Sequence, residues 1–286
     1  MTDSSRRTPS TPDLPDPLLV VEGLDVSYGS KRKPVTPVRD VSLSIGRGET
    51  LGVVGESGSG KSSVGRAILG LARASAGSIV FDGEEITHAT RRTRRRLAND
   101  LQVVFQDPRS SLNEAKTVGD ILAEPLIANR TSSRRESRDR AADLIEQVGL
   151  TTAALSRFPG AFSGGQRQRI AIARALMPAP KLVICDEPVS ALDLSVQAQI
   201  INLFRRLQRE TGVSYLFVAH DLSVVRLLSR RVLVMSAGRV VEQGETEQVY
   251  RHPEAAYTRR LLAAEPYPDP DIQRERRRAW DAMATA

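Results

Sequence analysis

Two kinds of apolar pattern recur along the chain. In three segments apolar residues alternate or cluster between glycine-containing turns, which is typical of short antiparallel strands. In four others nearly every residue is apolar, as parallel strands covered on both faces require. The first kind occupies residues 18–28, 38–45 and 78–83, and the second occupies residues 50–55, 101–105, 181–187 and 214–220. Because helical patterns separate the continuous runs, we expect an α/β core.

The strand-like runs disappear between residues 107 and 165. Ser133 and Glu136 have the spacing of a helix capping box, apolar residues follow at helical spacing, and Gly149 marks a stop. We therefore expect residues 107–165 to form an inserted, all-helical subdomain.

The two ends of the chain differ from its middle. Residues 1–17 are rich in proline, serine, threonine and aspartate without apolar periodicity, which predicts a disordered leader. We expect the main domain to span residues 18–245 and to end with a hairpin at 232–244. The remainder, 246–286, forms an extension with a helical pattern at 246–264 and then a polar tail.

Composition narrows the class of protein. Of the 286 residues, 40% are hydrophobic, which is enough for a sizeable core. The single cysteine, Cys185, lies in an apolar run, so we expect a buried thiol in a cytosolic protein. The N-terminus lacks the apolar stretch of a signal peptide, and no segment approaches the roughly 20 apolar residues of a membrane span. If the protein serves a membrane, other chains cross it.

The net charge of +7 comes from 41 basic and 34 acidic residues, with arginines concentrated at 91–96 and 274–278. Such runs usually form solvated faces, and attraction to anionic lipid or nucleic acid is the sharper alternative. Aromatic residues make up only 4% of the chain, so there is little material for base stacking.

One motif predicts a nucleoside triphosphate site. Residues 55–62, GESGSGKS, match G-x-x-x-x-G-K-[ST] and lie between an apolar strand and a helix pattern at 63–71. The glycines let backbone N–H groups converge on the β-phosphate, and the helix N-terminus adds positive potential. Lys61 offers a point charge, and Ser62 can ligate Mg²⁺. The bland alternative is a Gly/Ser-rich turn with an incidental lysine.

Polar residues follow three of the continuous strands. Asp186 and Glu187 end one of them, where a carboxylate is costly unless it meets a cation. We expect Asp186 to hold the Mg²⁺ and Glu187 to polarise an attacking water. The alternative is that both acids only cap a helix beginning near Ser190. Gln106 and His220 follow two other strands, so they would emerge at the same ligand-binding edge of the sheet.

A second Ser-Gly-Gly turn raises the question of why one chain needs two phosphate sites. The segment 162–176, FSGGQRQRIAIARAL, starts another helix and exposes backbone N–H groups. The order of elements from Tyr28 to about Gly244 resembles the ATP-binding subunits of ABC transporters. In that family the Ser-Gly-Gly-Gln signature contacts the γ-phosphate bound by the opposite subunit, so two chains pack head to tail around two ATP molecules. The resemblance implies a P-loop NTPase ABC ATPase core with an antiparallel β subdomain and an inserted α-helical subdomain.

The resemblance carries over to particular positions. Tyr28 matches the aromatic residue that stacks on adenine, Gln106 the mobile glutamine, and His220 the switch histidine. Residues 190–193, Ser-Ala-Leu-Asp, match the loop that links the two sites across the dimer. The implied nucleotide-binding residues are Tyr28, Gly55, Ser57, Gly58, Ser59, Gly60, Lys61, Ser62, Ser63, Gln106, Ser163, Gly164, Gly165, Gln166 and Asp186. The implied catalytic residues are Lys61, Gln106, Glu187 and His220, and the metal ligands are Ser62, Gln106 and Asp186.

A narrower resemblance points to the oligopeptide/dipeptide importer branch. The resemblance rests on residues 105–122, residues 185–204 and the segment HPEAAYTRRLLAAEP at 252–266. For the last segment, the alternative is an ordinary amphipathic closing helix. Two positions depart from these patterns: Phe162 stands where leucine is usual in the signature of the wider family, and Glu114 stands where proline is common in this branch. Some members of the branch bind an iron–sulfur cluster through C-terminal cysteines, which this tail lacks.

The expected function is therefore an ATPase subunit that powers an importer of oligopeptides, dipeptides or related small solutes. It would use ATP and Mg²⁺ at the cytoplasmic face of the cell membrane as a peripheral subunit. The implied partners are a second ABC ATPase subunit, identical or paralogous, two permease subunits and, indirectly, an extracytoplasmic solute-binding protein, with no nucleic acid. The alternatives are an importer subunit for nickel or another non-peptide solute, and a soluble ABC ATPase acting on nucleic acid or ribosomes.

Overall fold

The computed structural model describes residues 16–29, 35–128 and 133–264, which form two sheets with helices around them. The strands are β1 (Pro17–Tyr28), β2 (Val35–Gly46), β3 (Thr50–Val54), β4 (Ala74–Phe81), β5 (Glu84–Glu85), β6 (Leu101–Val104), β7 (Leu182–Asp186), β8 (Ser214–Ala219), β9 (Arg231–Ser236) and β10 (Arg239–Glu245). The helices are α1 (Lys61–Ile68), α2 (Arg91–Leu97), α3 (Pro108–Ser111), α4 (Val118–Ala128), α5 (Arg134–Gln147), α6 (Gly164–Leu176), α7 (Leu194–Thr211), α8 (Leu222–Leu228), α9 (Thr246–Arg251) and α10 (Ala256–Ala264).

The larger sheet has the order β10-β9-β3-β8-β7-β6. Strands β6, β7, β8, β3 and β9 run parallel, and β10 pairs with β9 in the antiparallel direction. The expectation drawn from the continuous apolar runs holds fully for β3 and β8, whose residues are all buried, and for all but the last residue of β7. β6 lies at the edge of the sheet, and its two middle residues are only partly buried. The smaller sheet, of order β2-β1-β4-β5, is antiparallel as predicted.

The larger sheet separates two hydrophobic cores. Side chains alternate between its faces, so Leu51 and Val53 of β3 belong to the core shared with the antiparallel sheet and α1, whereas Val54 belongs to the core under the other helices. Gly52 lies between them, and a Cβ there would meet Val225 Cγ1 at 2.0 Å. The strand that leads into the phosphate loop is therefore packed directly against α8.

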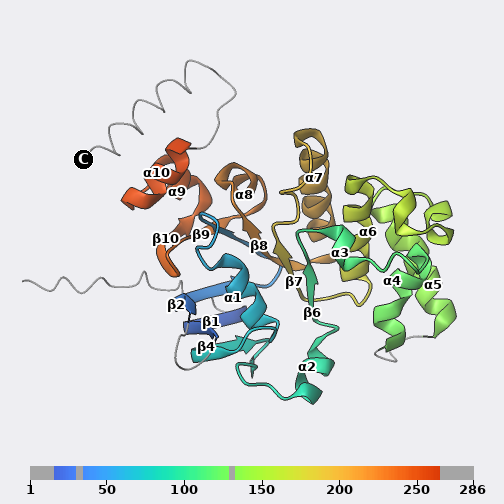
Figure 1. Ribbon diagram of the computed structural model, residues 1–286, viewed down its shortest axis with the longest axis horizontal. Helices are drawn as coiled ribbons and strands as arrows, with labels where there is room; N and C mark the ends of the chain where they lie inside the picture. The colour runs from blue at the N-terminus through green and yellow to red at the C-terminus, as the bar shows by residue number, and fades with distance from the viewer. Residues whose placement is uncertain (1–15, 30–34, 129–132, 265–286) are drawn as a thin grey trace, which may run out of the picture.

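The helical segment lies at one end of the molecule (Figure 1), with α9 and α10 at the opposite end. The described part of residues 107–165 holds α3, α4, α5, the 3₁₀ turns Thr152–Ser156 and Pro159–Ala161 and the start of α6, and it contains no strand. The capping box of Ser133 and Glu136 is confirmed at the start of α5. No helix in the described ranges has the length and apolar character needed to cross a bilayer.

Three features differ from the sequence-based expectations. The helix after Glu187 begins at Leu194, not near Ser190, because the Asp193 side chain accepts the Val196 N–H at 2.9 Å and caps it there. Residues 246–264 form two helices, with a break at 252–255 that contains Pro253. The predicted leader and polar tail fall almost wholly outside the described residues, as does the arginine run at 274–278.

The arginine run at 91–96 is not a purely solvated face. It forms α2, and Arg94 turns inward to donate hydrogen bonds to the carbonyls of Ile68 at 2.7 Å and Ile86 at 2.5 Å. This guanidinium ties α1 to the antiparallel sheet.

Cys185 is fully buried, as predicted, and burial raises the pKa of its thiol.

Candidate functional site

The loop between β3 and α1 has a backbone that only glycine accommodates at two positions. Gly55 and Gly60 have φ angles of 150° and 102°. A Cβ on Gly55 would meet Met235 O at 2.1 Å, and one on Gly60 would meet Pro37 O at 2.2 Å. The loop is therefore packed between β9 and β2, and its residues 56–58 face outward.

Lys61 is folded back into this loop and is only 4% exposed. Its Nζ donates hydrogen bonds to Gly55 O at 2.7 Å and Glu56 O at 2.9 Å. Burial lowers the pKa of Lys61, while the negative charges of Glu187, Asp186 and Glu56 oppose the shift. The loop thus presents a poorly solvated cation, which is an attractive partner for a phosphate.

A hollow of about 340 Å³ opens beside the loop and gathers residues from distant parts of the sequence. It is lined by Pro37, Ser57, Gly58, Gly60, Lys61, Ser62, Ser63, Gln106, Glu187 and His220. Gln106 follows β6, Glu187 follows β7 and His220 follows β8, so the carboxyl ends of three parallel strands meet the loop here. Of these residues, Pro37 was not predicted as a site residue, because no motif in the sequence includes it.

Glu187 is held in a strained conformation. Its φ of 51° is unusual for a residue with a side chain, and its backbone N–H donates to Val218 O at 3.0 Å. Glu187 is 8% exposed, and its Oε2 lies 2.5 Å from His220 Nε2. The contact aligns an acid and an imidazole at the edge of the hollow.

Oxygen donors suited to a hard cation meet at the base of the loop. Ser62 Oγ donates a hydrogen bond to Asp186 Oδ1 at 2.6 Å. Ser62 and Gln106 line the hollow, whereas Asp186 lies behind Ser62 and is not among the lining residues. Hydroxyl, carboxylate and amide oxygens fit Mg²⁺, which keeps several ligand positions for water and phosphate. No group of three or more His, Cys, Asp or Glu suited to a metal occurs in the described part of the chain.

Tyr28 lies at the outer edge of the loop. Its hydroxyl donates to Ser63 Oγ at 3.4 Å, and 38% of the residue is exposed. An aromatic ring next to the first turn of α1 offers a flat surface beside the phosphate loop.

The Ser-Gly-Gly-Gln segment lies elsewhere. Ser163 caps α6 through a reciprocal pair: Gln166 N donates to Ser163 Oγ at 3.3 Å, and Ser163 N donates to Gln166 Oε1 at 3.0 Å. A Cβ on Gly164 would lie 3.8 Å from Leu192, and one on Gly165 would meet Val196 Cγ1 at 2.5 Å. The turn therefore packs against the 190–193 loop and α7, and it does not line the hollow beside Lys61.

The two departures from the usual family pattern cause no conflict. Phe162 is buried in the core under the helices, and Glu114 is exposed.

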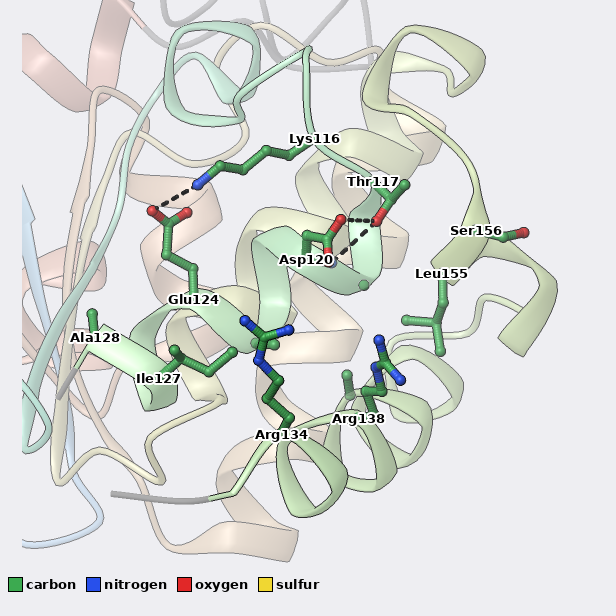
Figure 2. Close-up of a pocket in the computed structure, with 13 residues that line it drawn as sticks. Lys116, Thr117, Asp120, Glu124, Ile127, Ala128, Arg134, Arg138, Leu155 and Ser156 are labelled. Atoms are coloured by element: carbon green, nitrogen blue, oxygen red, sulfur yellow. Dashed lines mark hydrogen bonds and ion pairs between the residues drawn. The ribbon is translucent and has the colours of Figure 1, made fainter. Parts of the chain in front are cut away.

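A larger hollow, of about 810 Å³, lies in the helical segment (Figure 2). Its polar lining includes an ion pair between Lys116 Nζ and Glu124 Oε1 at 3.0 Å. Arg134 and Arg138 extend from α5 toward α4, and Ile127 contributes an exposed apolar surface. None of the residues that the sequence assigned to the nucleotide lines this hollow.

Comparisons with known proteins agree with this arrangement. A family model described as "ABC transporter" matches residues 38–190. The chain is 46% identical over 265 residues to the oligopeptide transport ATP-binding protein AmiF of Streptococcus pneumoniae, covering 92% of this chain and 86% of the relative. It is 50% identical over 245 residues to OppF of Escherichia coli, which bears the same description, covering 85% and 73%. The ATP-binding cassette MJ0796, solved as a dimer in a post-hydrolysis state bound to ADP and Pi, aligns with a TM-score of 0.72 at 27% identity over 80% of this chain and 98% of that one.

Proposed function

Because the chain belongs to the ABC transporter family, we propose that it is the subunit whose ATP hydrolysis powers an importer of oligopeptides. The observation that carries the proposal is the hollow where the Lys61 loop meets Gln106, Glu187 and His220. The peptide assignment is supported by relatives described as oligopeptide transport ATP-binding proteins.

The loop and its neighbours bind the nucleotide. Backbone N–H groups of residues 57–63 and the buried Lys61 ammonium receive the phosphates, and the exposed Tyr28 ring supports the adenine. Ser62, Asp186 and Gln106 would hold Mg²⁺, which would supply positive charge to neutralise the phosphates.

Glu187 accepts a proton from the attacking water. Its carboxylate is nearly buried, so few solvent molecules compete for it, and the contact with His220 fixes its direction. Lys61 and His220 then stabilise the charge that develops on the transferred phosphoryl group. The strained backbone at Glu187 keeps the carboxylate aimed into the hollow.

The second phosphate-binding turn serves the neighbour's site. Ser163, Gly164 and Gln166 are exposed and lie outside the hollow of their own chain, so a second subunit is needed to use them. Two chains packed head to tail, identical or paralogous, bring the turn of one against the Lys61 loop of the other. The dimeric, product-bound state of MJ0796 supports this arrangement.

Two permease subunits contact the helical segment. The hollow between α4 and α5 has the size and the mixture of apolar and charged groups that receives a short helix or loop. It lies on the segment that also carries the signature turn, so nucleotide-driven movement there reaches the membrane subunits at the cytoplasmic face. Residues 18–245 form the ATPase domain, and 246–286 form its extension.

An uptake experiment tests the function. Glu187→Gln removes the base with little change of shape, so hydrolysis should slow by about 10² to 10⁴. Cells that carry this variant in place of the wild type should lose uptake of labelled oligopeptides and keep nickel uptake. Loss of nickel uptake alone would assign the chain to the non-peptide alternative. Unchanged hydrolysis would remove Glu187 from its role.

A further inference from the structure

The C-terminal extension is anchored to the edge of the larger sheet by a buried carboxylate. Glu242 of β10 is 8% exposed and accepts hydrogen bonds from the backbone N–H groups of Glu254 at 2.8 Å and Ala255 at 3.1 Å. These residues immediately precede α10, whose Thr258 and Leu262 are buried. The start of α10 therefore has a fixed position relative to the sheet.

From this position α10 reaches the phosphate loop. The hydroxyl oxygen of Tyr257, in the first turn of α10, accepts a hydrogen bond from the backbone N–H of Glu56 at 3.0 Å. The Glu56 carbonyl accepts hydrogen bonds from Lys61 Nζ at 2.9 Å and from Ser59 N at 3.2 Å. Tyr257 therefore contacts Glu56, the same residue whose carbonyl oxygen accepts a hydrogen bond from Lys61.

Other supports of the loop come from β2, where Gly60 packs against Pro37 O, and from β9 and the turn after it. Gly55 packs against Met235 O, and Gly238 N donates to Ser59 O at 3.1 Å. Glu56 lies between these two fixed points and is itself exposed. The Tyr257 hydroxyl supplies a protein acceptor to this otherwise outward-facing part of the loop.

We propose that Tyr257 is a positioning residue that holds the empty phosphate loop in its nucleotide-binding shape. The inference rests on the proposed role of the loop in binding ATP. A loop that is already ordered loses less conformational freedom when phosphates arrive, so the hydroxyl raises nucleotide affinity. Once ATP is bound, its own phosphates order the loop, and the hydroxyl no longer affects the chemical step.

Tyr257→Phe removes only the hydroxyl and keeps the ring that packs against the core. By calorimetry on the full-length chain, the Kd for ADP should rise by about threefold to tenfold, the range for losing one neutral hydrogen bond. The KM for ATP should rise with it, while kcat at saturating ATP stays within about twofold. Tyr250→Phe is the matched control, because Tyr250 belongs to the same extension and faces Arg226. It should leave Kd, KM and kcat unchanged.

A second variant tests the contact between Tyr257 and Glu56 by weakening the attachment of α10 to Glu242. Glu242→Gln weakens the carboxylate that fixes the start of α10, so it should also raise the Kd for ADP with the hydroxyl still present. If Tyr257→Phe lowers thermal stability but binds ADP as tightly as the wild type, the tyrosine only packs, and the inference is wrong. If the wild type itself binds no ADP, the proposed function fails as well.

Discussion

Gly165→Ala offers a sharp test of the signature turn. A Cβ on Gly165 would lie 2.5 Å from Val196 Cγ1, whereas carbon atoms pack comfortably at about 3.5 to 4.0 Å. Val196 is β-branched and lies in the first turn of α7, so its side chain has little rotational freedom to move aside. The turn must therefore shift by about 1 Å away from α7.

The size of the effect follows from that displacement. A misplacement of about 1 Å in a catalytic arrangement can cost about 10² in rate, and we expect ATP hydrolysis to fall by that factor. Overpacking costs about 1 to 3 kcal/mol of folding stability. The better helix propensity of alanine offsets up to about 1 kcal/mol of this cost, so the thermal midpoint should fall by only a few degrees. ADP binding to the monomer should not change, because the turn does not line its own chain's hollow.

The assay is steady-state ATP hydrolysis by the full-length chain, with ADP affinity measured in parallel. Gly160→Ala is the matched control, because nothing lies within 4 Å of a Cβ at that position in the preceding 3₁₀ turn. Val196→Ala removes the obstructing methyl groups, so the double variant Gly165→Ala, Val196→Ala should recover to within about threefold of the wild type, as coupled neighbours do. Normal turnover by Gly165→Ala, or failure of the second substitution to rescue it, would refute the steric reasoning.

Two further predictions concern other parts of the chain. Ser163→Arg should reduce hydrolysis by more than about 10² and leave ADP binding by the monomer intact, because it obstructs the neighbour's site; an equal loss of monomer binding would contradict the shared site. Cys185 should resist a thiol-reactive disulfide reagent at pH 8 in the folded protein, because burial raises the pKa of its thiol and so keeps it protonated, and unfolding should release one reactive thiol. Rapid labelling of the folded chain would show that β7 opens readily.

The sequence predicts the fold and much of the hollow because the relevant signals are local. A continuous apolar run identifies each parallel strand, and the carboxyl ends of such strands share one edge of the sheet. That rule alone brings Gln106, Glu187 and His220 together with the loop, as the structure shows. The roles assigned to these residues stay predictions until variants are measured.

Long-range contacts escape the same reasoning. Tyr257 is 201 positions from Glu56, and nothing in the HPEAAYTRRLL segment indicates which part of the core α10 meets. The sequence does not distinguish Arg94 from the other arginines of residues 91–96, yet Arg94 is the one that donates hydrogen bonds to both Ile68 and Ile86. In both cases the outcome depends on how separate elements pack, which periodicity does not encode.

The tight fit at Gly52 links the strand below the phosphate loop to α8 and, through α8, to α9. With no space between β3 and α8, the helix that follows His220 cannot slide independently of the strand below the loop. Arg226 of α8 donates hydrogen bonds to both carboxylate oxygens of Glu247, at 2.5 and 2.8 Å. Its guanidinium also lies 4.1 Å from the centre of the Tyr250 ring, so α9 is fixed to α8. A displacement of α8 would therefore carry α9 with it and press on β3 below the phosphate loop.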